Sequence, residues 1–144
     1  VDAVLDFKLL GELPQRLQHD SSLGLLTPAG TLLPMSVALQ ANALHLQGLL
    51  QEQRWCGQWA LQQRFAAGSM VCGRLQALRP LLDLALPLER FEPAAGQTDG
   101  TLAHALERWI SLVILEQKLR IDVLPGQAKA VPRFGYGWLK ATVT

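Results

Sequence analysis

A first group of residues suited to binding or catalysis lies on one predicted helix. They are His104, Glu107, Arg108 and Ser111. Their spacing of three and four residues places an imidazole, a carboxylate, a guanidinium and a hydroxyl on one helix face, where a partner could bind through charge and hydrogen bonds. The same spacing describes an ordinary solvated helix face, which is the interpretation that it favours. We therefore take His104 and Arg108 as candidate contact residues on a face expected to be exposed to water.

A second group lies near the end of the sequence, where residues 133–140 read RFGYGWLK. Such a segment could form an aromatic platform on which a base, a sugar or a partner side chain stacks, while the flanking cations meet phosphate or carboxylate. The alternative, which the alternation favours, is a strand buried on both faces, with glycines where another element crosses closely. The candidate contact residues of this segment are Arg133, Phe134, Gly135, Tyr136, Gly137, Trp138 and Lys140.

Sequence motifs for four common chemistries are absent. The chain has no phosphate-binding loop ending in Gly-Lys-Ser/Thr, no Rossmann glycine fingerprint, no nucleophile elbow and no paired histidines at helical spacing. Sites assembled from distant residues stay open, because a catalytic triad is recognised by geometry rather than by order. Four carboxylates near a polar loop could supply an acid and a base, although a solvated loop is the favoured interpretation; they are Asp83, Glu89, Glu92 and Asp99. The sequence predicts no cofactor.

The two cysteines, Cys56 and Cys72, form no recognisable metal or redox motif. Together with His45 and His104 they match no ordinary zinc-finger spacing, and no recognised sequence motif for thiolate activation surrounds either cysteine. A disulfide between them stays open, but free buried thiols are the favoured interpretation. The compartment stays open too, with the cytoplasm favoured over the periplasm.

The chain has 144 residues, of which 49% are hydrophobic and 17% charged, with a formal net charge of +1. This length fits a single globular domain, residues 1–144, with its own core. A nucleic-acid partner stays open but is not favoured, because the few cations are scattered. Residues 21–51 carry no formal charge, yet prolines and polar residues interrupt every window long enough to span a bilayer, so no membrane span is predicted. The Leu-, Arg- and Gln-rich, Lys-poor composition indicates a bacterial source.

The clearest predicted element is a long amphipathic helix from residue 101 to about residue 118, with Thr101 placed to cap its first turn. Its apolar face, expected to pack on a sheet, comprises Leu102, Leu106, Trp109 and Val113. A polar loop over residues 89–100 precedes the helix, and the alternation of residues 119–123 predicts a half-buried strand after it. The apolar run before Glu116 leaves open an earlier change from helix to strand.

The pattern of residues 36–65 is ambiguous between strand and helix. Alternation predicts strands over residues 37–40 and 44–47, joined by a turn at residues 41–43. A helix from Leu44 to Trp55 is the competing interpretation, because Ala, Leu and Gln are good helix formers.

Three prolines mark the other predicted boundaries. Residues 1–10 are predicted to form a strand that stops before Pro14. A helix over residues 69–78 should end or kink at Pro80, and a further short helix should begin there and stop at Pro87. The predicted fold class is α+β, an antiparallel sheet packed against one long amphipathic helix and one or two shorter helices.

The glycine-rich end from Gly126 to Lys140 resembles the C-terminal glycine-rich loop of the RNA-binding RAMP proteins of CRISPR systems. Residues 35–41, followed by residues 44–50, are similar to the first strand and helix entry of that family. The resemblance implies a ferredoxin-like fold and contact with crRNA near Gly135 and Gly137. The net charge of +1 departs from the basic surface of such proteins.

The function predicted from the sequence is that of a non-catalytic interaction or assembly subunit of a bacterial multiprotein complex, with another protein or a second copy as its partner. The alternatives are a RAMP-like RNA-binding protein and a small enzyme with a site outside the known motifs. An exposed apolar patch would favour the first, a positive groove at Arg133 and Lys140 the second, and a deep polar pocket the third.

Overall fold

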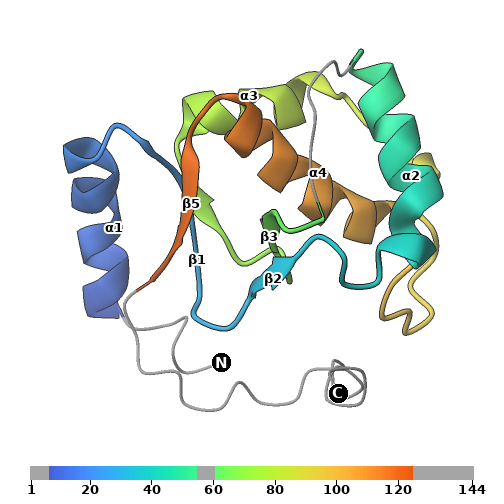
Figure 1. Ribbon diagram of the computed structural model, residues 1–144, viewed down its shortest axis with the longest axis horizontal. Helices are drawn as coiled ribbons and strands as arrows, with labels where there is room; N and C mark the ends of the chain where they lie inside the picture. The colour runs from blue at the N-terminus through green and yellow to red at the C-terminus, as the bar shows by residue number, and fades with distance from the viewer. Residues whose placement is uncertain (1–6, 55–60, 125–144) are drawn as a thin grey trace.

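The computed structural model of the chain describes residues 7–54 and 61–124. Helices and strands alternate along these residues (Figure 1), which confirms the predicted α+β class. In chain order the elements are α1 (Phe7–His19), β1 (Leu23–Thr27), β2 (Leu32–Pro34), α2 (Leu39–Glu52), β3 (Arg64–Ala66), β4 (Cys72–Gly73), α3 (Leu75–Asp83), the 3-10 helix η1 (Leu88–Arg90), α4 (Leu102–Glu116) and β5 (Arg120–Val123). None of the described helices combines the length and apolar character needed to cross a bilayer.

An antiparallel sheet was predicted, whereas the larger sheet of the structure is mixed. Its strand order is β4-β1-β5, with β1 antiparallel to β4 and parallel to β5. The parallel pair arises because the chain returns to β1 only after passing through α2, α3 and α4, a crossover long enough to restore the strand direction. Strands β2 and β3 form a separate antiparallel pair.

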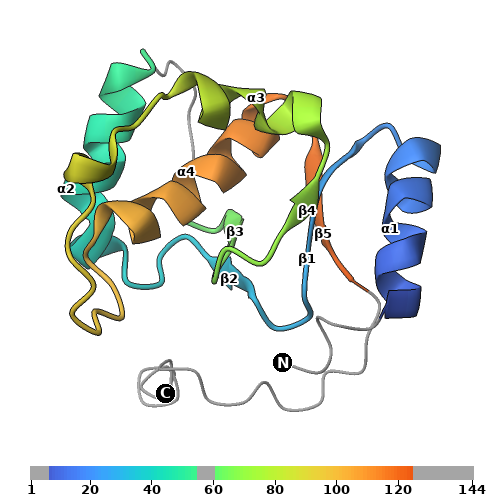
Figure 2. The same ribbon diagram turned by 180° about the vertical axis from the view of Figure 1, so that it is seen from behind.

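Strand β1 is the middle strand of the larger sheet, and its five residues are all buried. Leu23 and Leu26 face α1, and Leu25 faces α3 and α4, so the sheet has helices on both sides (Figures 1 and 2). Gly24 allows the close packing of α4, since a Cβ at this position would lie 2.8 Å from Cγ2 of Ile114. A continuous apolar run with glycine is what a strand buried on both faces requires.

The long helix forms as predicted. The side chain of Thr101 caps α4 by accepting a hydrogen bond from the backbone N–H of His104, and the helix ends at Glu116, two residues before the expected boundary. Lys118 then adopts a positive φ of 59°, which reverses the chain into β5. The predicted strand over residues 119–123 is therefore confirmed.

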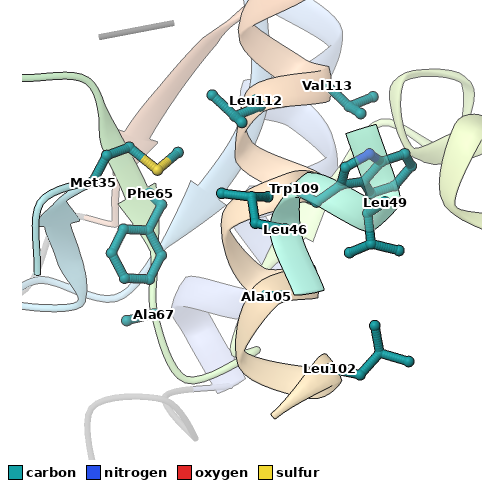
Figure 3. Close-up of a cluster of buried hydrophobic side chains, with 10 residues drawn as sticks. All are labelled: Met35, Leu46, Leu49, Phe65, Ala67, Leu102, Ala105, Trp109, Leu112 and Val113. Carbon is teal, nitrogen blue, oxygen red and sulfur yellow. The ribbon is translucent and has the colours of Figure 1, made fainter. Parts of the chain in front are cut away.

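The apolar face of α4 packs mainly against α2 rather than against the sheet. Trp109 is 1% exposed and points toward Leu46 and Leu49 of α2, while Phe65 and Met35 close the other side of the cluster (Figure 3). This confirms Trp109 as a core residue. The cluster is the main hydrophobic core, and it joins α2 and α4 to the β3 strand.

The strands predicted over residues 37–40 and 44–47 are wrong, because the chain there forms the single helix α2. Residues 38–52 contain many good helix formers and no β-branched residue. The helical period also places Asn42, Leu46 and Leu49 together on the buried side. The competing helix interpretation was correct in type, although α2 begins five residues before Leu44.

The prolines are weaker boundaries than predicted. Helix α1 continues through Pro14, so the strand expected for residues 1–10 is wrong over its described part. Helix α3 likewise continues through Pro80, although the preceding residues 72–73 form β4 instead of helix. Each proline removes one helical hydrogen bond. The loss in α1 is offset by burial of Leu13 and that in α3 by burial of Ala77.

The C-terminal end of α1 is fixed by a guanidinium from outside the helix. Nε of Arg74 donates to the carbonyl of Leu23 at 2.8 Å, and Nη2 donates to the carbonyl of Asp20 at 2.6 Å and to that of Leu17. A cation at the carboxyl end of a helix also meets the negative end of its dipole. Arg74 therefore joins α1 to the start of α3.

The ferredoxin-like fold implied by the RAMP resemblance is not seen in the described residues. That fold runs strand-helix-strand-strand-helix-strand. Here the first described element is a helix, and α3, η1 and α4 follow one another between β4 and β5.

Candidate functional site

The polar residues of the structure converge at the start of α4, around Arg108. Its guanidinium is 2% exposed and donates from Nη1 to the carbonyl of His104 at 2.8 Å and from Nη2 to the carbonyl of Val37 at 2.7 Å. Nη2 also lies 3.4 Å from Oδ1 of Asp99, which supplies the opposite charge. A buried cation needs such a partner, because desolvation would otherwise disfavour it strongly.

Asn42 of α2 completes this cluster from the other side. Its Nδ2 donates to Oδ1 of Asp99 and to the carbonyl of Ala38, each at 2.8 Å, and its Oδ1 accepts from the backbone N–H of Gly100 at 3.0 Å. Gly100 has a φ of 82°, a conformation that glycine adopts without strain. Asn42 therefore positions the end of the loop before α4.

The guanidinium of Arg108 also stacks on an aromatic ring. Its Cζ lies 4.3 Å from the centroid of Phe65 in β3. A cation over an aromatic face gains electrostatic attraction, more so where water is excluded. Arg108 thus connects α4 to β3, to the segment before α2 and to the loop before α4, with Asp99 and Asn42 as its polar neighbours. We call Asn42, Asp99 and Arg108 the anchor cluster.

A second set of polar contacts surrounds the first turn of α4. Glu92 accepts from the backbone N–H of Leu102 at 3.0 Å and lies 3.2 Å from Nε2 of His45 on α2. The hydrogen bond from Leu102 lowers the pKa of the Glu92 carboxyl, and nearby histidines add to this. Oγ1 of Thr101 lies 2.6 Å from Nδ1 of His104. These side chains satisfy donors at the start of a helix, where backbone N–H groups lack partners.

One turn further along α4, Glu107 and Ser111 bind the turn after β3 and the last residue of β3. Glu107 accepts from the backbone N–H of Gly68 at 3.0 Å and from the hydroxyl of Ser69 at 3.1 Å. Ser111 accepts from the backbone N–H of Ala66 at 3.0 Å. Burial raises the pKa of the Glu107 carboxyl, despite these two bonds.

The predicted solvated face of α4 is therefore wrong. Arg108 is 2% and Ser111 1% exposed, because α2, β3 and the preceding loop cover this side of the helix. Of the four carboxylates expected in a solvated loop, Asp83 and Glu89 are exposed but lie on α3 and η1, whereas Glu92 and Asp99 bind across the fold. The helix pattern contains no information on a cover supplied by distant segments.

The sequence interpretation missed Asn42. A signal was present, since Asn42, Leu46 and Leu49 lie on one side of a helix at spacings of four and three residues. The strand interpretation placed Asn42 in a turn and so concealed it. Its partner Asp99 is 57 residues away in the sequence.

The structure brings together only part of the other predicted sites. Cys72 is a free, half-buried thiol whose pKa is raised by burial, which is opposite to thiolate activation. Among the described residues no group of three His, Cys, Asp or Glu side chains could hold a metal ion. The aromatic segment of residues 133–140 and Cys56 lie outside the described residues, so the predictions made for them stay predictions.

The surface offers a different kind of site. Several leucines on helices are largely exposed: Leu44 is 83% exposed on α2, Leu75 73% and Leu82 63% on α3, and Leu88 83% on η1. These side chains belong to none of the buried clusters. They are the most exposed large apolar side chains of the described residues and are available for contact with another molecule.

Fold and site together define an α+β unit whose described polar residues mainly join its own segments. No protein-family model matches the chain, and no solved structure matches it. The chain is 40% identical over 105 residues to WxcX of Xanthomonas campestris pv. campestris, an uncharacterized protein found in two strains. The aligned residues are 73% of this chain and 15% of WxcX, so the chain spans well under a fifth of the length of these relatives.

Proposed function

We propose that this chain is a non-catalytic interaction module of a bacterial multiprotein assembly. The observation that carries the proposal is the set of exposed leucines on α2, α3 and η1. Single exposed leucines are common on soluble proteins. Here the proposal depends on their arrangement along the helices.

Helix α3 presents two of these leucines on one side. Leu75 and Leu82 are separated by seven residues, which is two helical turns, so they project in nearly the same direction. Arg79 lies between them and pairs with Asp83 at 3.5 Å, which places a charged pair beside the apolar side chains. Burial of each leucine in an interface would contribute about 1.5–3 kcal/mol, so this face resembles the apolar centre and polar rim of a contact surface.

The polar side chains at the start of α4 support a non-catalytic role. Arg108, Asn42 and Glu92 are each bonded to backbone groups of the same chain, and Glu107 holds a turn. Catalytic groups must instead face a substrate. These side chains are used to fix the fold.

The relatives support the bacterial part of the proposal, because WxcX is a protein of Xanthomonas campestris. The matched region is 15% of the length of WxcX, so in that protein it has neighbours within a longer polypeptide. Exposed leucines would give such a region surfaces with which to contact its neighbours.

The test is a pull-down of the tagged chain from its native bacterium, comparing wild type with a Leu75→Asp, Leu82→Asp double variant. A partner retained by wild type and lost from the double variant is the expected result. Gln76→Asp, an exposed neutral residue on the same helix, serves as the matched control and should retain it. The proposal fails if wild type and double variant bring down the same proteins and migrate at the same native mass.

A further inference from the structure

Helix α2 has one face committed to the fold and one face that no described residue covers. Asn42, Leu46 and Leu49 are buried against the rest of the molecule. The opposite side consists of the exposed residues Gln40, Ala41, Ala43, Leu44, Gln47 and Gln51, together with the partly exposed Gly48. Between Leu39 and Gln51 the helix carries no Asp, Glu, Lys or Arg. This exposed side is called the α2 outer face below.

The α2 outer face contains a projecting side chain and a gap one turn apart. Leu44 is 83% exposed. Gly48 follows four residues later, and a Cβ added to it would meet nothing within 4 Å. Glycine inside a helix is destabilising relative to alanine. The packing of the described residues therefore provides no reason for glycine at position 48.

We propose that the α2 outer face is the contact surface of a homodimer, in which two copies of α2 cross antiparallel and Leu44 of each copy packs over Gly48 of the other. The inference deepens the proposed function and rests on it, because it names the partner of one of the exposed leucines. The two-fold axis would pass midway between Leu44 and Gly48. It would also bring Ala41 of one copy opposite Gln51 of the other.

The geometry points to a second copy because a two-fold contact must be complementary to itself. A projection and a gap on the same face, one helical turn apart, meet this condition when the helix is paired with its own reverse. Small residues at Ala41 and Gly48 allow the two helix axes to approach closely, as in packed helix pairs. A surface that binds a different protein would not need to be complementary to itself.

The absence of charge on this face also supports a second copy as the partner. Two identical charged faces would bring like charges together, and the α2 outer face avoids this because it is uncharged. The exposed glutamines Gln47 and Gln51 are neutral and can each donate and accept hydrogen bonds, so neither needs an opposite charge on the second copy. At the C-terminal end of the helix, Glu52 is already paired with Arg90 of the same chain at 2.8 Å.

The central test is sedimentation equilibrium or light scattering of the whole chain over a range of concentrations. We expect wild type to show a concentration-dependent change from one-chain to two-chain mass. Gly48→Leu fills the gap and should weaken dimerisation roughly tenfold or more. Gly48→Ala should weaken it less while raising the Tm of the monomer by a few degrees, roughly 2–8 °C per helix glycine replaced.

Two matched controls separate this effect from general changes in helix stability. Gly11 lies inside α1 and a Cβ there also meets nothing within 4 Å, so Gly11→Ala should raise the Tm without changing the dimer. Leu44→Glu should abolish the dimer, whereas Leu75→Glu on α3 should leave it intact.

The proposal is overturned if wild type has the mass of one chain at every concentration, or if Gly48→Leu and Leu44→Glu dimerise as wild type does. Failure here is distinguishable from failure of the proposed function. A one-chain mass together with a partner lost from the Leu75 and Leu82 double variant would reject the homodimer and retain the interaction module.

Discussion

The two sides of α2 differ in how completely their groups are matched within the chain. On the inner side, Asn42 uses both its amide nitrogen and its oxygen, binding Ala38, Asp99 and Gly100. On the outer side, Leu44 is 83% exposed and Gly48 leaves open space. The inner side is explained by this fold alone. The outer side makes no such bonds with the described residues, and the proposed homodimer would give it a partner.

This comparison separates residues that specify the fold from residues available for function. Buried charges such as Arg108 and Asp99 contribute little net stability while paired, because pairing has to offset their desolvation. They do fix where the loop of residues 91–101 lies, since few other arrangements would satisfy them. His104 and Arg108, which the sequence offered as contact residues for a partner, thus mainly hold segments of the same chain in position.

The largest expected effect is on the inner side. Arg108→Met should lower the free energy of unfolding by about 3–5 kcal/mol, because it leaves Asp99 buried without its cation. Denaturant unfolding followed by fluorescence of the tryptophans measures the loss. A loss below about 1 kcal/mol would show that water replaces the guanidinium and that the anchor cluster is dispensable.

Two further variants make this result specific. Arg79→Met removes an exposed pair, 74% and 60% exposed, and should cost at most about 1 kcal/mol. Asp99→Asn combined with Arg108→Met should cost less than the two single losses added together, because the unpaired charge is gone.

A smaller effect is expected at Asn42, where the two sides of α2 can be compared directly. Asn42→Ala should cost about 1–3 kcal/mol, because Gly100 loses an acceptor and Asp99 a donor in a buried site. Leu44→Ala, two residues further along the same helix, should change monomer stability by no more than about 0.5 kcal/mol. Equal losses at both positions would remove the distinction between the two sides.

The smallest effect is expected at the border between the two sides, where His45 meets Glu92. The pKa of Glu92 is lowered in the folded chain, chiefly by the hydrogen bond from Leu102. A depressed carboxyl pKa contributes stability above its unfolded value of about 4.3, and this contribution is lost as the pH falls through the folded value.

The measurement is the pH dependence of unfolding in wild type and in Glu92→Gln. The variant should lose stability less steeply than wild type as the pH falls below about 4.3. Other carboxyls with lowered pKa values, Asp20 among them at about 2, decline in the same range, so the difference between the two curves is the relevant quantity. Parallel curves would mean that Glu92 does not contribute through its charge.

The sequence predicted those features whose causes are local. Thr101 caps α4 through the N–H of His104, three residues away, and the turn at Lys118 leads directly into β5. The α+β class and the core position of Trp109 followed from the same local periodicity.

The features that were missed depend on distant segments. Arg108 is buried by the carbonyl of Val37, 71 residues away, and by the ring of Phe65. Pro14 was taken as the end of an element, but α1 continues because Leu13 is buried and Arg74 binds its last carbonyls. Two patterns of equal strength described α2, and only the cover supplied by α4 decides between them.

The parallel pairing of β1 with β5 also determines the order of events during synthesis. Asp20, just before β1, bonds to Arg120 at the start of β5, 100 residues later in the sequence. The central strand therefore acquires its parallel neighbour only when nearly all the described chain has left the ribosome. Pairings this distant slow folding, because a long loop must close before the contact is gained. Until then the backbone N–H and C=O groups of β1 that pair with β5 lack their partners, and the incomplete chain is most prone to aggregate at this stage.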